Sequence, residues 1–515
     1  MRVIVILLSF IVVFTAEISA QNQANWWFFG AYAGLNFNSM STGANPIPTA
    51  VNNGAMRTTE GCASISDASG NLLFYTDGIT VWDSRHQTMP NGTGLMGNGS
   101  STQSGVIVPD PVNKKKYFVF TADHGGAGII HRGLRYSVVD MSLNSGFGDV
   151  ATASKNTLVF APCAERITAT KIKGANGYWV IAQELGVNKY RAYRVTGGAV
   201  SATPVTSTIG PTPSGTSFLG YMKANPQGDR IGVCYYTPVS TTFVMDFNAS
   251  TGVLSNLKQD ASSGSMYGLE FSGDGKKLYA AKYNSGDIFQ YDAYAANQTA
   301  FNASRRTITA TGVSGVKAMQ IGPDLKIYVA KSGNRLAVIR NPNATGTACN
   351  LVDSGPTISG GTPTARVTLG LPTFVQSFFI KTDLEVSNSC VKNQTVISVL
   401  DTSKVDSVKY VYGDTSSGAN NISWNKLDSH VYNAPGKYPV TAFAFYTDPT
   451  TGKVVKDTLI DTVEVLAPPQ IWLGNDTTIC TKDTIYITKL DTMPGKFYWW
   501  DSVETRGHRV DTAGL

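Results

Sequence analysis

The side chains best placed for chemistry are acidic and aromatic residues that fall near predicted turns in the first third of the chain. They are Glu60, Asp77, Trp82, Asp83, Glu165 and Glu184. Two converging carboxyl groups can act as acid and base in glycoside hydrolysis, and an exposed tryptophan can stack on a sugar ring. Acidic residues at turns, however, more often accept hydrogen bonds from the turn backbone than take part in catalysis. We therefore predict contacts to a ligand for these six residues, and no catalytic residue.

Other motifs give little support for cofactor or metal chemistry. A GxGxxG match at residues 92–97 lacks the flanking strand and helix of a dinucleotide site, so we interpret it as a glycine-rich loop. His124 and His131 flank a second glycine-rich stretch, but histidines in loops are usually solvated. The sequence contains no HExxH, P-loop or GxSxG motif. No cofactor and no metal are predicted.

Composition points to many short strands rather than long surface helices. Only 15% of the 515 residues are charged, and 51 are glycine. The net charge of +6 is scattered, and the densest basic run, residues 114–116, falls in a predicted hairpin turn. Nucleic-acid binding needs a concentrated basic face. We therefore expect no nucleic-acid partner.

The first twenty residues have the pattern of a signal peptide. Arg2 precedes an apolar stretch at residues 3–15, and small residues lead to a cleavage site after Ala20. The stretch is short for a membrane span, and no later segment is long and apolar enough for one. We expect an exported protein, secreted or displayed on the bacterial outer surface. Export permits disulfides, but six widely spaced cysteines leave both disulfides and buried thiols open.

The elements that must position these residues come from an internal repeat. An apolar strand, a turn rich in Gly, Asp or Asn, and a second aromatic-rich strand recur about every 45 to 60 residues. The copies lie at residues 64–75, 107–118, 170–179, 223–231, 269–279 and 319–328. Such hairpins bury both faces only when several stack around an axis, so the repeat predicts a β-propeller over residues 21–381.

The two ends of this region offer one further blade. Residues 26–30 and 35–37 supply early strands, and residues 370–379 supply a late one. Pairing them in one sheet would close the ring without an exposed edge. We therefore favour about seven blades, with six as the alternative.

The repeat stops near residue 382, and a different strand pattern follows. Residues 388–466 predict a small β-sandwich, ended by Pro468 and Pro469. Residues 471–515 begin a third unit and stop where another strand would start, so we expect an incomplete domain and a fragment of a longer protein. The fold class is all-β throughout.

Several segments resemble one family of exported proteins from gliding Gram-negative bacteria, the gliding-motility-associated or PKD-domain-containing surface proteins. They are residues 25–30 (NWWFFG), 33–37 (AGLNF), 59–67 (TEGCASISD), 73–78 (LFYTDG) and 133–141 (GLRYSVVDM). Residues 411–416 (VYGDTS) and 430–441 (HVYNAPGKYPVT) resemble the turn and closing strand of a PKD domain. The resemblance implies type IX secretion, surface display, and contacts of the PKD domain with protein or carbohydrate. It implies no catalytic residue.

Three functions follow as hypotheses. The favoured one is a surface binding or adhesion protein with an extracellular protein or carbohydrate partner, used in adhesion or gliding, and not an enzyme. The second is a structural scaffold within a surface assembly. The third is a polysaccharide-active enzyme, which would bring two carboxyl groups roughly 5 to 10 Å apart in the central cleft.

Overall fold

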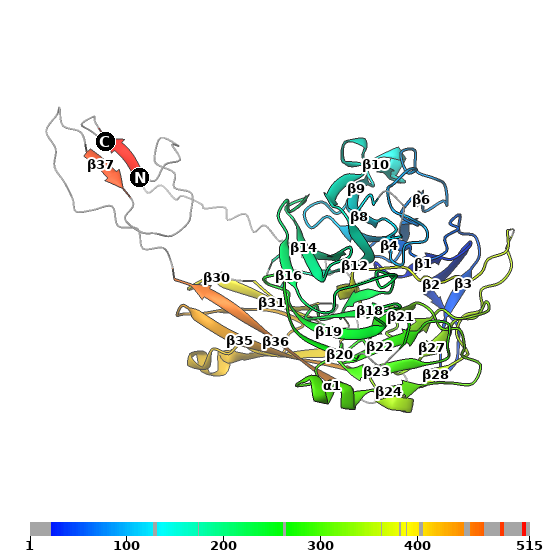
Figure 1. The fold of residues 1–515 in the computed structure, drawn as a ribbon. Coiled ribbons are helices and arrows are strands. Elements are labelled where there is room, and N and C mark those ends of the chain that lie inside the picture. Colours follow the sequence, from blue (N-terminus) through cyan, green and yellow to red (C-terminus); the bar gives the residue numbers. More distant parts are fainter. Residues whose placement is uncertain are drawn as a thin grey trace. The chain divides into compact units, whose positions relative to one another are not determined.

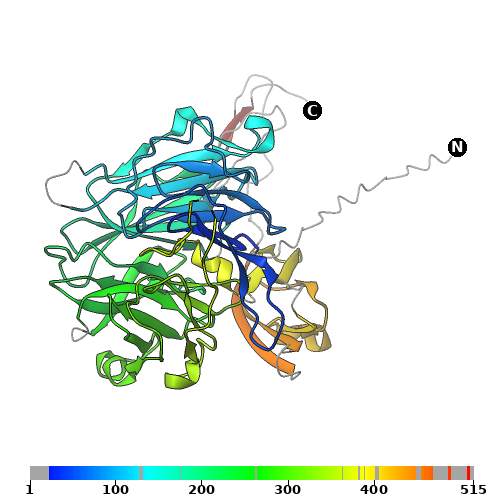
Figure 2. The ribbon, with the colours of Figure 1, turned by 90° about the vertical axis from the view of Figure 1, so that its right-hand side faces the viewer.

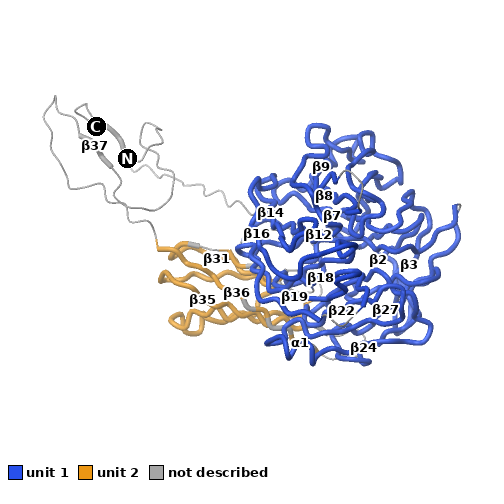
Figure 3. Tube along the Cα trace, in the orientation of Figure 1, with its two compact units in different colours: residues 1–383, 400–404, 449–452 blue, residues 384–399, 405–448, 453–515 orange. Residues whose placement is uncertain are grey.

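The computed structural model describes most of the chain between residues 22 and 510. The described residues are 22–126, 131–173, 175–260, 264–361, 363–380, 383–387, 389–400, 405–447, 454–467, 485–488 and 507–510. Small antiparallel sheets dominate, and α1 (Gln298–Ser304) is a short exception. The prediction of an all-β fold is confirmed. The chain divides into two compact units, the first covering residues 1–383 with two short later segments (Figure 3).

In its described residues, unit 1 contains seven small antiparallel sheets that follow one another in chain order. Figures 1 and 2 show their arrangement. The first sheet is β1 (Trp26–Phe29), β2 (Ala33–Met40) and β3 (Pro48–Val51), and the second is β4 (Ala63–Ser66), β5 (Leu72–Thr76) and β6 (Val81–Asp83). The third is β7 (Gly105–Pro109), β8 (Lys116–Ala122), β9 (Leu134–Asp140), β10 (Asp149–Val150) and β11 (Thr157–Phe160). The fourth is β12 (Cys163–Lys171), β13 (Tyr178–Glu184), β14 (Lys189–Thr196), β15 (Ala199–Val200) and β16 (Val205–Thr208).

The remaining three sheets have four strands each. The fifth is β17 (Met222–Ala224), β18 (Arg230–Tyr235), β19 (Thr241–Asn248) and β20 (Val253–Asp260). The sixth is β21 (Met266–Phe271), β22 (Lys277–Lys282), β23 (Ile288–Asp292) and β24 (Arg306–Ile308). The seventh is β25 (Met319–Ile321), β26 (Ile327–Val329), β27 (Ala337–Ile339) and β28 (Leu351–Val352).

The sheets are arranged in a closed ring, as in a β-propeller. The first strands of consecutive sheets pack on each other, from β4 on β7 through to β21 on β25. The seventh sheet meets the first through aromatic rings, because Tyr328 lies 5.6 Å from Trp27 and 5.5 Å from Phe37 between ring centroids. Stacking of this kind buries both faces of each sheet, so the core runs around the ring. The fold of unit 1 is thus propeller-like.

One late segment closes the ring at the inner edge of the first sheet. Arg366 pairs antiparallel with Ala31 of the β1–β2 turn, and Pro372 pairs in parallel with Cys62. In Figure 2 this yellow segment lies beside the blue strands. The sequence predicts a strand at residues 370–379, but the structure has isolated bridges followed by a 3₁₀ turn at Gln376–Phe379. Pro372 has no N–H to donate, which limits a continuous ladder.

The turns of the repeat follow the expected chemistry. Between β21 and β22, Gly275 has φ of +69°, and its N–H donates to the carbonyl of Ser272 at 2.8 Å. The Asp274 carboxylate accepts from the Ser272 hydroxyl at 2.6 Å. A glycine suits this left-handed position because it has no Cβ.

Unit 2 has two main sheets that share one apolar core. One sheet is β29 (Asp383–Val386), β31 (Gln394–Leu400) and β34 (Leu427–Val431). The other is β30 (Ser389–Cys390), β36 (Val454–Leu466), β35 (Gly436–Thr447), β32 (Ser407–Val411) and β33 (Ile422–Ser423). Ile397, Tyr410 and Val440 are fully buried between them. A separate hairpin pairs β37 (Ile485–Thr488) with β38 (Gly507–Val510).

The described residues bear on two points raised by the sequence, which are the state of the cysteines and the presence of membrane-spanning helices. Cys62, Cys163, Cys234, Cys349 and Cys390 are all free thiols. Across the described residues, no helix is long and apolar enough to cross a membrane. The predicted signal peptide at residues 1–20 lies outside the described residues, as does most of 471–515.

Candidate active site

The site lies where the N-terminal ends of the inner strands meet at one end of the ring. Short hydrogen bonds tie the segments that lead into these strands to their neighbours. The Gly61 N–H donates to the Ser101 carbonyl at 2.9 Å, and the Tyr221 N–H donates to the Tyr267 carbonyl at 2.8 Å. Residues distant in sequence are thereby collected around the axis, as loops of a propeller allow.

Glu165, near the start of β12, is a carboxylate with a full set of donors. Its Oε2 accepts from the Thr102 N–H at 2.8 Å and from the Thr102 hydroxyl at 3.1 Å. Its Oε1 accepts from the Gly125 N–H at 2.9 Å. Burial raises the pKa of Glu165, and these hydrogen bonds oppose the rise by favouring the charged form.

Glu60, just before β4, is a second buried carboxyl with the opposite surroundings. Burial, together with the nearby charge of Glu165, raises the pKa of Glu60 to about 8. Its Oε2 has no hydrogen-bond partner among the described residues. Because the Glu165 carboxylate opposes ionisation of Glu60, the raised pKa keeps a proton on Glu60 at neutral pH.

Two tyrosines complete the wall beside Glu60. Tyr221 and Tyr267 are almost completely buried, and their rings meet edge to face at 5.6 Å between centroids. Within the described part of the chain, neither hydroxyl has a partner with full hydrogen-bond geometry. Buried polar groups are normally satisfied, and exceptions cluster at functional sites. Glu60 Oε2 and the two hydroxyls are thus buried without well-formed hydrogen bonds, although the Tyr267 hydroxyl lies close enough to the Glu60 carboxyl to lower its pKa.

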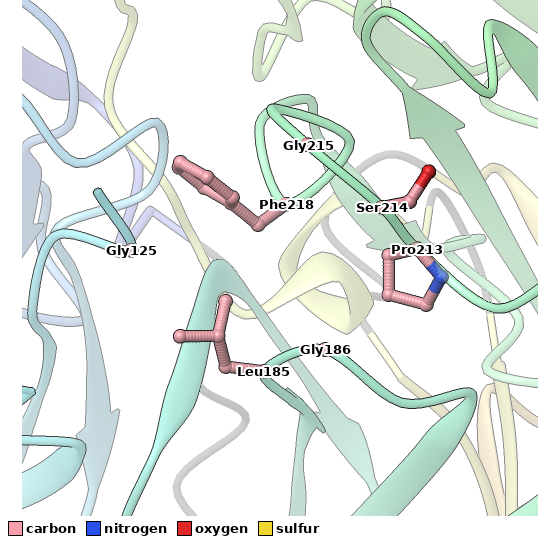
Figure 4. Close-up of a pocket in the computed structure, with 7 residues that line it drawn as sticks. All are labelled: Gly125, Leu185, Gly186, Pro213, Ser214, Gly215 and Phe218. Atoms are coloured by element: carbon pink, nitrogen blue, oxygen red, sulfur yellow. The ribbon is translucent and has the colours of Figure 1, made fainter. Parts of the chain in front are cut away.

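A pocket with a volume of about 200 Å³ opens next to Glu165. It is lined by Gly125, Leu185, Gly186, Pro213, Ser214, Gly215 and Phe218, and the Phe218 and Leu185 side chains project toward each other in Figure 4. The Gly125 N–H that binds Glu165 is therefore part of the pocket wall. Only the peptide unit of Gly125 would separate a ligand in the pocket from the Glu165 carboxylate.

His124 joins the pocket to Glu165. Its Nε2 lies 3.7 Å from Glu165 Oε1, and its ring lies 6.3 Å from the Phe218 ring between centroids. The Gly126 N–H donates to Nδ1 at 2.8 Å. Nδ1 is thus an acceptor, which places the imidazole proton on Nε2, facing the carboxylate.

Arg166 holds the pocket loop in place. It is fully buried and donates to the carbonyls of Ser217 and Leu219 at 2.6 and 2.7 Å. Its guanidinium also lies over the Tyr235 ring at 4.4 Å. The loop that carries Phe218 is therefore fixed by a charged anchor, which favours a preformed pocket.

The other four predicted residues have local roles instead. Asp77 accepts from the Ile79 and Thr80 N–H groups at 2.8 Å, which makes it a turn-capping residue. Asp83 binds the Arg85 side chain, and Glu184 forms ion pairs with Arg191 and Lys189. Trp82 is half-buried and stacks on Tyr75 at 5.5 Å. The structure brings together only Glu60 and Glu165.

Sequence reasoning did not select Thr102, Tyr221 or Tyr267 as site residues, because a single hydroxyl residue just before a strand or near its start carries no distinguishing pattern. His124 was singled out only as a metal candidate. In the described residues, no group of three His, Cys, Asp or Glu side chains could hold a metal ion. The GxGxxG match at 92–97 lies in the loop between β6 and β7 and precedes no helix.

Comparison with known proteins gives no match by sequence but several by structure. No family model and no curated protein matches the chain. Among solved structures, it is similar to the periplasmic gluconolactonase PpgL of Pseudomonas aeruginosa, at 13% identity and a TM-score of 0.34, over 76% of this chain and 94% of that one. It is also similar to Hsv2 of Kluyveromyces lactis (10%, TM-score 0.35, 61% and 91% covered) and to a luciferin-regenerating enzyme (13%, TM-score 0.33, 54% and 85% covered).

Two of these three structures, the gluconolactonase and the luciferin-regenerating enzyme, are those of enzymes. They contradict the prediction of an adhesion protein without catalytic activity. We therefore correct both the predicted function and the prediction that the chain is not an enzyme. At this distance the names assign no substrate and no residue role to this chain. Those have to come from the geometry of the site.

Proposed function

We propose that unit 1 is a hydrolase that cleaves a C–O bond in a sugar-derived small molecule by acid–base chemistry. One observation carries the proposal. Glu60 is buried, has a pKa raised to about 8 and leaves one carboxyl oxygen unpaired, while the nearby Glu165 accepts three hydrogen bonds. A pair of carboxyl groups in unlike environments is the usual arrangement of a general acid with a charged partner.

The roles follow from what each group can donate or accept. Glu60 donates its proton to the oxygen of the leaving group; water then attacks the carbon and gives its proton to the Glu60 carboxylate, which restores the acid. Glu165 stays ionised and stabilises positive charge that develops on the reacting carbon. The hydroxyls of Tyr221 and Tyr267 donate hydrogen bonds to the substrate oxygens nearest Glu60. The pocket at Phe218 receives the apolar face of the ligand.

The test is hydrolysis by the full chain of a panel of 4-methylumbelliferyl glycosides and of gluconolactone. Activity on at least one member, lowered at least a hundredfold in Glu60→Gln, supports the proposal. Glu184→Gln is the matched control, because that carboxylate is held in ion pairs with Arg191 and Lys189. Full activity in Glu60→Gln would refute the assignment of the acid.

We also propose that the protein is exported and that unit 2 is a PKD-like β-sandwich of the family of surface proteins from gliding bacteria. The pattern of residues 1–20 supports export, and the family's secretion route belongs to the same proposal. Two sheets around one core support the sandwich. N-terminal sequencing of the protein from a culture supernatant tests export, with Gln21 expected as the first residue.

A further inference from the structure

Three neighbouring chain segments enter the ring at the same end as Glu60. The Ala318 N–H donates to the Leu369 carbonyl at 3.2 Å, and the Leu369 N–H donates to the Thr59 carbonyl at 3.0 Å. These bonds place residues 317–318, 366–369 and 57–60 side by side. Each segment carries one cation at its outer end, which is Lys317, Arg366 or Arg57.

Local pairing directs the two arginines to the same side. Ala31 forms antiparallel bridges with both Arg57 and Arg366, one on each side of it. Residues directly paired across neighbouring strands project their side chains to the same face. Both arginines are exposed, and Lys317 is half-buried. The two arginines therefore border one patch of surface, and Lys317 lies on the adjoining segment, next to Ala318, which bonds to Leu369.

These cations lack the acidic partners that several other cations of unit 1 have. Arg85, Arg191, Arg230 and Arg305 each lie within 4 Å of a carboxylate. Among the described residues, none of the three cations forms an ion pair with an acidic side chain. Burial lowers the pKa of Lys317, and no carboxylate offsets that effect. An unpaired and partly desolvated cation is stabilised by an anion from outside the chain.

The patch adjoins the candidate active site. Arg57 precedes Glu60 by three residues on a segment that bends at residues 59 and 60. On the neighbouring segment, Gly370 follows Arg366 by four residues and packs directly against the Glu60 backbone. The two arginines therefore lie on the segments that lead to Glu60 and cover its backbone.

We propose that Arg57, Arg366 and Lys317 form an anion-binding subsite, so that the substrate is a sugar derivative carrying a carboxylate or a phosphate. This rests on the proposed function, since it names the substrate class of the same site. The oxyanion binds the two guanidinium groups and the ammonium, and the bond to be cleaved lies next to Glu60. Arginine forks match both carboxylate and phosphate geometry.

The test measures binding to the full chain by calorimetry, with glucose, glucuronate, glucose 6-phosphate and inorganic phosphate as probes. We expect one charged sugar to bind at least tenfold tighter than glucose. The preference between glucuronate and glucose 6-phosphate shows which anion the subsite takes. We expect this tighter binding to weaken as salt concentration rises.

Variants assign the effect to the three side chains. Arg57→Gln/Arg366→Gln should abolish the preference for the charged sugar, and Lys317→Met should lower it about tenfold. Arg335→Gln is the matched control, because this exposed arginine already binds Thr357 and the Asp353 carbonyl. Thermal unfolding of each variant shows whether it is folded. Equal affinity for charged and neutral sugars, or a preference unchanged in the double variant, would overturn the proposal.

The two proposals fail separately. Glu60→Gln should keep the charged-sugar preference, because the glutamine retains the shape of the site. An anion preference in a wild-type protein with no hydrolytic activity would refute only the proposed function. Glu60-dependent hydrolysis that is equally fast for neutral and charged substrates would refute only the anion subsite.

Discussion

The proton on Glu60 predicts a specific dependence of stability on pH. In the folded protein burial raises the pKa of Glu60 to about 8, whereas the unfolded chain has a value near 4.3. Between these values the folded state holds a proton that the unfolded state has released. The stabilisation from this group is complete below about pH 4 and is lost as pH rises toward 8, at about 1.4 kcal/mol per pH unit. From pH 5 to pH 8 the loss approaches ~4 kcal/mol, as an upper value.

The comparison with Glu60→Gln isolates this effect, because glutamine is close in shape and does not titrate. Urea unfolding of the full chain at pH 5, 6.5 and 8, followed by circular dichroism, gives the free energy of unfolding of unit 1 for both proteins. We expect the variant to gain stability relative to wild type as pH rises. Parallel pH dependence in the two proteins would mean that Glu60 is ionised at neutral pH, and the proposed acid would lose its basis.

Three further predictions concern other parts of the structure. Lys223 and Glu270 form a buried ion pair with 2.6 Å between Nζ and Oε2, so Lys223→Met should destabilise unit 1 by about 3–5 kcal/mol, and Lys223→Met/Glu270→Met should recover much of that loss in thermal unfolding. Gly370→Ala should cost about 2 kcal/mol or more and lower any hydrolytic activity, because a Cβ there would overlap the Glu60 backbone; calorimetry and the hydrolysis assay check both. His430 Nε2 lies 3.0 Å from Asp414 Oδ2 in unit 2, so His430→Ala should destabilise that unit by about 2 kcal/mol in urea, while the unit 1 transition stays unchanged.

The repeat was visible in the sequence because turn chemistry and strand alternation act locally. The repeat copy at residues 269–279 forms the β21–β22 hairpin, as predicted. The lysine run at residues 114–116 lies at the β7–β8 turn, which was also predicted. The closing segment was harder to predict, because it pairs with residues about 300 positions earlier. Its bridges depend on the finished ring, and Pro372 breaks the pattern that would mark an ordinary strand.

The candidate site was predictable only in part. The sequence selected Glu60 and Glu165 as acidic residues near strand ends, and it selected Asp77 and Asp83 on the same ground. In the structure Asp77 caps a turn, and Asp83 forms an ion pair with Arg85. Burial does not separate the two groups, because Asp77 and Asp83 are as buried as Glu60. Asp77 and Asp83 take their donors from neighbours in the same turn, whereas the donors of Glu165 come from segments 40 and 63 residues away, which only tertiary packing brings close. Tyr221, Tyr267 and the three cations gain their importance from neighbours in other sheets. No spacing in the sequence records those neighbours.

The closing segment also sets the order in which the molecule can acquire activity. The Thr368 hydroxyl donates to the Thr58 carbonyl across 310 residues of chain, and Gly370 covers the backbone of Glu60. A nascent chain that has not yet reached residue 370 lacks this cover, so Glu60 stays hydrated and titrates as an ordinary carboxyl. The proposed chemistry at this site therefore requires that the last segment of unit 1 has been synthesised and docked.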